Sequence, residues 1–423
     1  MKKRILLIVS LLAVVCLLSG CSMLNLNQME SMFRKESSVP PENQKIFGSN
    51  DSDTVTIGRD EYEKLSQFSE LAELIDMAEE VFYQDTDRAK MLEYAAKGLM
   101  AALDDPYSFY YSPEEFQEMW EDDEGNYTGI GVLISANYET QLCIISRVFK
   151  GSPAEAAGVQ RGDQLYRVGE DLYVTADNLN EAVDIMRGEP GTDVDVTFLR
   201  NGEEITFTIT RQMVSVNQVE SKMLNDKVGY IALYQFAGES EKEFEKDLNS
   251  LISEGAEGII IDLRDNPGGW VEQARYIADL FLDRGELCYL VYKGGEENHT
   301  EYLTKNGKVD VKLVILMNEN SASSSEILCG ALQDRADATV VGTTSFGKGI
   351  VQMVQYVGKN GAGYQMTVAS YYTPNGNAVH KVGITPDVEC MIPEGDNGMY
   401  DFADLEKDVQ LQKALEVMME KLN

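Results

Sequence analysis

A cluster of small hydroxyl residues lies where an apolar segment gives way to a predicted helix. The run Lys312–Met317 predicts a buried strand, a helix is predicted over 323–333, and the residues Ser321-Ala322-Ser323-Ser324-Ser325-Glu326 join them. A serine in a strand-to-helix turn can act as a nucleophile, and N–H groups at a helix N-terminus can stabilise an anion. Serine three residues before glutamate is also an ordinary helix-capping box, so this pattern alone does not establish catalysis.

A lysine between two glycines follows 25 positions after Ser323, in the segment Phe346-Gly347-Lys348-Gly349-Ile350-Val351-Gln352. A neutral lysine amine can take the proton of a serine hydroxyl, but at the ordinary lysine pKa of about 10.4 the charged form dominates. We therefore expect Lys348 to be enclosed by apolar groups, with no carboxylate beside its amine. A buried salt bridge to Lys348 would contradict this role.

The residues before this lysine partly match a phosphate-binding loop. Gly342 to Lys348 has the spacing of the first seven positions of that motif. The eighth position requires Ser or Thr to hold magnesium, but here it is Gly349, and the following residues alternate like a strand. We therefore reject nucleotide binding at this loop.

A third segment offers accessible backbone after a buried strand. The apolar run Gly258–Leu263 leads into Asp262-Leu263-Arg264-Asp265-Asn266-Pro267-Gly268-Gly269. Backbone N–H groups of glycines can approach a substrate oxygen closely. The structural alternative is a tight turn that needs glycine for its geometry.

Histidine provides a competing base. The chain has only two, His299 and His380, so a site built on several histidines is excluded. His380 as the base of a Ser-His-Asp triad is retained as an alternative to Lys348, although its polar surroundings are typical of a surface residue. His299 follows two glutamates closely and is expected to be solvated.

The composition limits the class of function. The 423 residues include 36 Lys and Arg against 71 Asp and Glu, a formal net charge of −35. This acidity argues against a nucleic-acid partner, which requires a basic surface. No CxxC pair occurs, so we expect no metal site and no cofactor. An even number of cysteines outside the cytoplasm permits disulfides, but we favour buried thiols for the four in the body: Cys143, Cys288, Cys329 and Cys390.

Several regions must position these residues. Residues 57–126 show helical periodicity, and residues 127–212 combine short alternating strands with two short helices, as in a small partly open β-barrel. Residues 213–395 alternate continuous apolar strands with helices, which predicts an α/β core with a mixed sheet covered by helices. Residues 396–423 form a C-terminal helical region.

The N-terminus has the pattern of an export signal, with three basic residues before the apolar run Ile5–Leu18. That run is shorter than the roughly 20 residues that span a membrane, so we expect a cleaved signal peptide over residues 1–20. Leu18-Ser19-Gly20-Cys21 resembles the lipobox of bacterial lipoproteins, which implies acylation of Cys21 and a flexible tether over residues 21–56. The protein would then lie on the extracytoplasmic face of the bacterial cell membrane, or on a periplasmic membrane face.

Taken together, these segments resemble the S41 carboxy-terminal processing proteases. That family carries a DLRxNPGG turn, an SASASE nucleophile segment and an FGKGxVQ lysine loop, in the order found here. It also has a PDZ domain before the protease core, and residues 127–212 are similar to one. The other matching segments are the carboxylate-binding loop Tyr127–Val132, the helix start Gly151–Ala154, and the landmarks Leu103–Ser108 and Gly383–Asp387.

The resemblance implies roles for individual residues. Ser323 would be the nucleophile, Lys348 the general base, and Gln352 the residue that orients the lysine amine. An oxyanion hole would combine the N–H of Ser324 with that of Gly268 or Gly269.

The sequence departs from the family pattern at two of its positions. Asp265 stands where Asn is usual, and Ser324 stands where Ala is usual. Because Ser324 would act through its backbone N–H, we expect its side chain to matter little.

The PDZ domain suggests how a substrate would be selected. An extended peptide can add as a strand at a sheet edge while N–H groups bind its free C-terminal carboxylate. The predicted binding residues are Gly129, Ile130, Gly131 and Val132. The family resemblance implies that this domain also gates the core, and we hypothesise that Arg187 contacts the core in that switch. A surface arginine before a turn is the alternative.

We therefore predict a membrane-anchored, extracytoplasmic serine endopeptidase that cleaves C-terminal tails or unfolded segments of proteins by a Ser-Lys dyad. Its partners would be protein or peptide substrates with free C-termini and, through the lipid anchor, the membrane. The alternative is a non-catalytic PDZ scaffold at the membrane with a protease-like core. A homo-oligomer and an activating partner are retained as alternatives for the working state.

Overall fold

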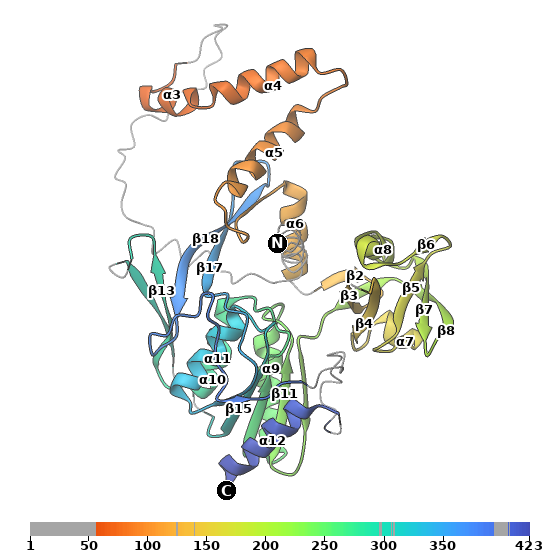
Figure 1. The fold of residues 1–423 in the computed structure, drawn as a ribbon, viewed down its shortest axis with the longest axis vertical. Coiled ribbons are helices and arrows are strands. Elements are labelled where there is room, and N and C mark those ends of the chain that lie inside the picture. The colour runs from red at the N-terminus through yellow and green to blue at the C-terminus, as the bar shows by residue number, and fades with distance from the viewer. Residues whose placement is uncertain are drawn as a thin grey trace.

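The computed structural model describes residues 56–123, 126–138, 140–295, 298–305, 307, 309–392, 405 and 407–423. They form an N-terminal helical region, a small β-domain and a larger α/β core (Figure 1). The predicted signal peptide, Cys21 and nearly all of the tether lie outside the described residues. Within the described ranges, no helix combines the length and apolar character needed to cross a membrane.

The α/β core is built on a six-stranded mixed sheet in the order β10-β11-β12-β15-β16-β19. Its strands are β10 (Val219–Met223), β11 (Val228–Leu233), β12 (Gly258–Asp262), β15 (Lys312–Met317), β16 (Thr339–Gly342) and β19 (Val388–Glu389). β10 is antiparallel to β11, and the other neighbours are parallel. Every residue of β11 and β12 is buried, as expected for strands covered on both faces.

Helices cover both faces of this sheet, which confirms the predicted architecture. α9 (Ser240–Ser253), α10 (Val271–Phe281) and α11 (Ser324–Arg335) pack on one face, and α12 (Val409–Leu422) packs on the other. Side chains of one strand alternate between the two cores. In β12, Ile259 and Ile261 pack in the core under α9–α11, whereas Ile260 packs under α12.

A second, five-stranded sheet includes a strand from the N-terminal region. Its order is β1-β18-β13-β14, with β17 also paired to β18. The strands are β1 (Phe109–Tyr111), β13 (Gly285–Tyr292), β14 (His299–Thr304), β17 (Ile350–Tyr356) and β18 (Gly363–Tyr372). β1 runs antiparallel to β18, with Phe109 opposite Gln365. The N-terminal region therefore joins the sheet that contains β17, the strand directly after the predicted lysine loop.

The small β-domain has a sheet in the order β3-β4-β5-β7-β8, with β6 paired to β5 and a separate β2–β9 pair. Its strands are β2 (Asn126–Gly129), β3 (Val132–Asn137), β4 (Leu142–Val148), β5 (Gln164–Val168), β6 (Leu172–Tyr173), β7 (Asp193–Arg200), β8 (Glu203–Thr210) and β9 (Gln212–Ser215). Its α-helices are α7 (Pro153–Ala157) and α8 (Leu179–Met186), and the short 3₁₀ helix η1 (Ala176–Asn178) precedes α8. Asn201 and Gly202 have φ values of 53° and 83°, as a tight hairpin turn between β7 and β8 requires.

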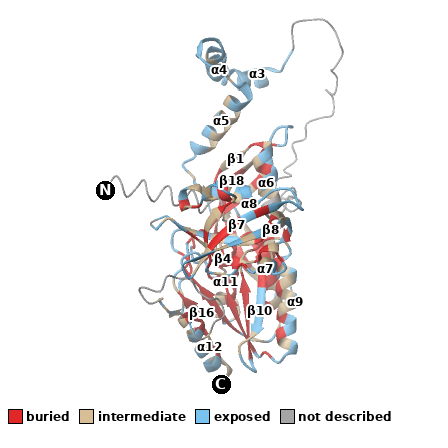
Figure 2. Cartoon of the chain, turned by 90° about the vertical axis from the view of Figure 1, so that its right-hand side faces the viewer, coloured by how far each residue is buried: buried red, intermediate tan, exposed pale blue. Residues whose placement is uncertain are grey.

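The N-terminal helices are α3 (Arg59–Ser66), α4 (Ser69–Val81), α5 (Arg88–Ala101) and α6 (Pro113–Asp123). In Figure 1, α3 and α4 extend away from the core. Much of their apolar stripe faces solvent, as Figure 2 shows: Phe68 is 60% and Leu74 is 63% exposed, while Ile75 is buried. The helical periodicity is thus confirmed, but its apolar face is mostly uncovered by the described residues.

The four body cysteines are free thiols, and three of them are buried, as predicted. Cys390 is half-buried instead, because it lies beside the end of the edge strand β19. In the described part of the chain, no group of His, Cys, Asp or Glu side chains is arranged to hold a metal ion.

A buried ion network ties the turn after β12 to the C-terminal helix. Arg264 Nη2 lies 2.6 Å from a carboxylate oxygen of Asp262 and 2.6 Å from one of Asp408. Asp408 also accepts the N–H of Leu411 at the start of α12 (2.9 Å). The arginine of the DLRDNPGG segment therefore holds the glycine turn against a helix more than 140 residues away in sequence.

Replacing Arg264 by methionine should destabilise the protein by about 3–5 kcal/mol, because two buried carboxylates would lose their cation. Urea unfolding of the variant measures this loss. Arg88→Met is the matched control, since Arg88 is half-exposed between Asp76 and Glu79 and its loss should change the unfolding free energy by less than about 1 kcal/mol. Equal losses in the two variants would contradict the structural role of Arg264.

Candidate active site

Ser323 lies in a strained turn between β15 and α11. Its backbone has φ 58° and ψ −117°, which residues with a side chain rarely adopt, and the residue is fully buried. Flanking hydroxyls hold the turn: Ser321 Oγ donates to the Leu263 carbonyl (2.7 Å), and Ser325 Oγ donates to the Asn266 carbonyl (2.9 Å). The serine segment is therefore fixed on both sides of Ser323 to the turn that follows β12.

The Glu326 carboxylate joins the serine turn to the lysine loop. It accepts hydrogen bonds from the N–H groups of Ser323 (2.8 Å), Gly347 (2.7 Å) and Lys348 (2.9 Å), and from Ser345 Oγ (2.5 Å). Burial raises the pKa of this carboxyl despite the opposing effect of the four donors. Ser323 and Glu326 do form a capping box, but the same carboxylate also fixes the backbones of the predicted nucleophile and base.

Lys348 is enclosed as the sequence predicts for a base. Only 2% of the residue is exposed. Its Nζ lies 4.7 Å from the centroid of the Tyr107 ring. Among the described residues Nζ has no hydrogen-bond partner, carboxylates included. The amine is therefore buried beside an aromatic ring, with no hydrogen-bond or ionic partner among the described residues.

Gln352, on β17, is fully buried four residues after Lys348. Its Nε2 donates to Thr367 Oγ1 on β18 (3.1 Å). Its Oε1 finds no hydrogen-bond donor in the described parts of the chain. The amine of Lys348 can donate a hydrogen bond and the amide oxygen of Gln352 can accept one. Each buried polar group left unpaired costs about 1–3 kcal/mol, so a bond between them would be favourable. A hydrogen bond between them is the chemistry that would orient the lysine amine.

The glycine turn lies directly against the serine. A Cβ added to Gly268 would lie 2.8 Å from Ser323 Cβ and 2.9 Å from Ser324 N, so only glycine fits there. The Gly268 N–H is already engaged, since it donates to the Asn266 side chain (2.9 Å). This bond makes Gly268 the weaker of the two glycine candidates for an oxyanion hole.

Gly269 is better placed to donate. Phe236 pairs with the carbonyl of Gly268 and the N–H of Trp270, so the N–H and carbonyl of Gly269 point to the opposite side. On that side Ser324 Oγ donates to the Gly269 carbonyl (2.7 Å). Within the described residues neither the Ser324 N–H nor the Gly269 N–H donates to a protein acceptor. These two N–H groups are therefore the donors that the geometry favours.

The two departures from the family pattern have visible consequences. Asp265 Oδ1 accepts from the side-chain amides of Asn318 and Asn320, both at 2.8 Å, so an acid is accommodated at a position with φ 57°. The Ser324 hydroxyl was expected to matter little, but it is fully buried and bonded to Gly269. It thus connects the two segments that carry the favoured oxyanion donors.

Ser324→Ala should lower the free energy of unfolding by about 1–3 kcal/mol, because it leaves the buried Gly269 carbonyl without its donor. The N–H of residue 324 is unchanged, so we expect kcat to stay within about threefold of the wild type. Ser325→Ala, which removes a similar buried hydroxyl bond to Asn266, is the matched control for stability. A hundredfold loss of kcat in Ser324→Ala would show that the hydroxyl itself takes part in the reaction.

His380 lies beside the lysine loop but lacks the partner that a triad needs. A Cβ added to Gly349 would lie 2.1 Å from His380 N, so the two backbones are in close contact. Burial lowers the pKa of His380, and its Nδ1 is buried with no hydrogen-bond partner among the residues described. A triad histidine donates from this nitrogen to a carboxylate. The geometry therefore favours Lys348 over His380 as the base.

The predicted peptide-binding loop connects β2 to β3. Gly129 ends β2, Ile130 is buried, and Val132 begins β3. Gly131 has φ 89°, and its added Cβ would lie 2.2 Å from Ser152 Cβ, so this position requires glycine. The carbonyl of Ile130 accepts the N–H of Ala154 in α7 (2.8 Å). The loop is thus seated on the helix that begins with the GSPA segment.

Two arginines of the β-domain have different surroundings. The guanidinium of Arg187, the residue expected to touch the core, lies 5.4 Å from the centroid of the Tyr127 ring. Arg147 stacks 3.6 Å from the centroid of the core residue Tyr234 and donates to the Asn217 carbonyl (2.5 Å). Arg147 is the one that sequence reasoning missed, because it appears only as one polar residue in an alternating strand.

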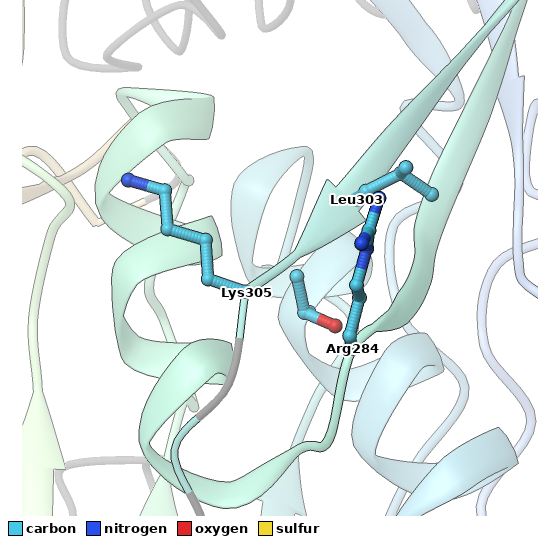
Figure 3. Close-up of a pocket in the computed structure, with 4 residues that line it drawn as sticks. Arg284, Leu303 and Lys305 are labelled. Carbon is cyan, nitrogen blue, oxygen red and sulfur yellow. The ribbon is translucent and has the colours of Figure 1, made fainter.

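A hollow lies away from this site (Figure 3). It is lined by Arg284, Leu303, Thr304 and Lys305. Arg335, at the end of α11, donates to Thr304 Oγ1 (3.2 Å), whereas Ser323 precedes the start of the same helix. A helix of this length spans about 18 Å. The hollow therefore has no part in the site around Ser323.

Three protein-family models match the sequence. The N-terminal domain of the activating protease CtpB matches residues 25–115, the PDZ domain matches residues 128–210, and peptidase family S41 matches residues 227–390. The last match contains Ser323, Lys348, Gln352 and the glycine turn.

This chain is similar over most of its length to carboxy-terminal processing proteases. The carboxy-terminal processing protease CtpA of Bacillus subtilis is 35% identical over 331 residues, which cover 78% of this chain and 70% of that protein. A carboxyl-terminal-processing protease of Synechocystis is 38% identical over 335 residues, covering 77% and 76%. The solved structure of a photosystem II D1 C-terminal processing protease has a TM-score of 0.50 and 26% identity, covering 78% of this chain and 86% of that one.

Proposed function

Because this chain belongs to the carboxy-terminal processing serine proteases of peptidase family S41, we propose that it is a membrane-anchored, extracytoplasmic endopeptidase with a Ser323–Lys348 dyad. One observation carries the dyad: the Glu326 carboxylate binds the backbones of both residues. The serine and the proposed base are thus held by a common group. The buried Lys348 amine, in addition, has no ionic partner among the described residues.

The reaction follows from this arrangement. Lys348 Nζ takes the proton of Ser323 Oγ as the oxygen attacks the scissile carbonyl. The N–H groups of Ser324 and Gly269 stabilise the oxyanion, and the lysine then gives its proton to the leaving amine. Water, deprotonated by the same lysine, then attacks the acyl-enzyme, and the lysine returns that proton to Ser323 Oγ as the acyl–oxygen bond breaks. Gln352 Oε1, which has no donor among the described residues, would accept a hydrogen bond from the amine and keep it oriented during these transfers.

The β-domain would select the substrate. Its glycine loop, Gly129 to Val132, would bind a free C-terminal carboxylate while the peptide adds to the neighbouring strand. This mode supports cleavage of C-terminal tails or unfolded segments, and binding would also gate the core. A substrate with an amidated C-terminus should therefore be cleaved more slowly than the same substrate with a free one.

The membrane anchor rests on the N-terminal sequence. Acylation of Cys21 after removal of residues 1–20 would hold the protease on the extracytoplasmic face of the membrane. A chemically tagged fatty acid fed to a bacterium that expresses the full-length chain should label the protein, and Cys21→Ala should remove the label. Labelling that persists in Cys21→Ala would contradict the lipoprotein proposal.

The proposed activity is tested with the full-length chain and an unstructured protein of defined C-terminus, in the presence of a metal chelator. Wild type should cleave it, while Ser323→Ala and Lys348→Ala should not. Cleavage that survives Ser323→Ala would identify a different nucleophile. If the wild type stays inactive even with added C-terminal peptide, the non-catalytic PDZ scaffold is the better description.

A further inference from the structure

The N-terminal turn at residues 105–108 forms part of the lysine pocket. This turn belongs to the landmark Leu103–Ser108, to which the proposed mechanism assigns no role. We propose that Tyr107 is a positioning residue for the reaction, because its ring covers the Lys348 amine and offers its face to the ammonium that forms during proton transfer. This inference rests on the proposed Ser323–Lys348 dyad.

The direct contact is between the aromatic ring and the amine. Lys348 Nζ lies 4.7 Å from the Tyr107 ring centroid, within the range of a cation–π interaction. Tyr107 is half-buried, and Lys348 is only 2% exposed. The ring therefore lies over an amine that is almost closed off from solvent.

The turn is anchored so that the ring has a defined place. The Asp105 carboxylate accepts the N–H of Tyr107 (3.2 Å) and the hydroxyl of Ser108 (2.5 Å). The Tyr107 carbonyl accepts from Gln365 Nε2 on β18 (3.0 Å). Main-chain and side-chain bonds thus fix the residues on both sides of the ring.

Thr367, also on β18, links the turn to Gln352. The N–H of Thr367 donates to Ser108 Oγ (3.1 Å), and Thr367 Oγ1 accepts from Gln352 Nε2 (3.1 Å). The turn that carries Tyr107 and the Gln352 amide proposed to orient the lysine are therefore both hydrogen-bonded to β18. A shift of the N-terminal region relative to this strand would disturb both.

The chemistry explains why a ring is suited to this place. Before the reaction the amine must be neutral, and an apolar wall keeps water away from it. When the amine takes the serine proton it becomes an ammonium, and the face of an aromatic ring attracts a cation without supplying a carboxylate that would hold the proton permanently. The gain is therefore largest in the transition state, which raises kcat rather than substrate affinity.

The test compares kcat and KM of the full-length chain with variants at Tyr107, using an unstructured substrate. Tyr107→Ala should lower kcat about 10-fold or more, with KM within about twofold of the wild type. Tyr107→Phe keeps the ring and should restore kcat to within about twofold. Tyr107→Leu fills much of the volume without an aromatic face and should remain several-fold impaired. Tyr110→Ala removes an aromatic side chain from the adjoining strand β1 and should leave kcat unchanged.

Two outcomes would overturn the inference while leaving the proposed function intact. Wild-type kcat in both Tyr107→Ala and Tyr107→Leu would show that the ring does not assist the reaction. A Tyr107→Phe variant as impaired as Tyr107→Ala would assign the effect to the hydroxyl. If Tyr107→Ala does not fold, as judged by its thermal unfolding, Tyr107→Leu and Tyr107→Phe decide between these results. Failure of the proposed function appears separately, as Ser323→Ala cleaving at the wild-type rate.

Discussion

Replacing Lys348 by methionine is expected to abolish proteolysis, lowering kcat by about 10⁴-fold or more, while the fold remains at least as stable as that of the wild type. Activity falls because methionine cannot take the Ser323 proton. Stability is kept because the Lys348 amine is buried and has no hydrogen-bond partner among the described residues, so an apolar side chain of similar length removes a desolvated polar group. Peptide cleavage and urea unfolding on the same preparation measure both effects.

Lys359→Met is the matched control, since Lys359 is exposed in the turn between β17 and β18. Both its activity and its stability should stay at the wild-type level. A Lys348→Met variant that lost stability as well as activity would indicate a structural lysine, and one that kept its activity would exclude Lys348 as the base.

Glu326→Gln is expected to lower kcat by about 10²-fold or more and the free energy of unfolding by about 3 kcal/mol. The Glu326 Oε1 atom accepts from Ser345 Oγ and Gly347 N, and Oε2 accepts from Ser323 N and Lys348 N. An amide NH₂ in place of either oxygen would face two donors. The turn of the nucleophile and the loop of the base would then lose their common anchor. Cleavage kinetics and urea unfolding test the two parts of this prediction.

Glu326→Gln is also expected to change how the stability of the protein depends on pH. Burial raises the pKa of Glu326 above its ordinary value of 4.5, so the folded protein retains this proton at a higher pH than the unfolded chain does. The contribution of Glu326 to stability is therefore present below its ordinary pKa of 4.5 and is lost as the pH rises through its raised pKa in the folded protein. The difference in stability between wild type and Glu326→Gln should change over that interval. Glu319→Gln, at an exposed carboxylate bonded to Thr343, should not show the activity loss. Equal behaviour of the two variants would contradict the role of Glu326.

The strands of the core could be predicted because their sequence signal is local. β11 and β12 are continuous apolar runs between polar helices, and a strand covered on both faces needs that composition. The short helix α7 could also be predicted from local residues, since Ser152 caps its start and Gly158, at φ 92°, ends it. The exposure of the stripe on α3 and α4 could not be predicted, because periodicity identifies an apolar face without identifying what covers it.

The candidate site was predicted by family resemblance, and local pattern alone favoured a helix cap at Ser323. The structure confirms the helix cap and shows that the same Glu326 carboxylate also binds the lysine loop. That second role depends on hydrogen bonds to residues 21 and 22 positions later. The contact of Tyr107 with Lys348 and that of Arg147 with Tyr234 also join residues far apart in sequence. Contacts of this kind follow from the fold and have no local signal.

The most direct test of the Ser323–Lys348 chemistry is to identify the residue that a serine-reactive fluorophosphonate modifies in the full-length protein. Peptide mapping by mass spectrometry should find a single adduct on Ser323 in the wild type, and strongly reduced labelling in Lys348→Met, because the hydroxyl is a weak nucleophile without its base. An adduct on another residue, or undiminished labelling of Ser323 in Lys348→Met, would contradict the proposed dyad.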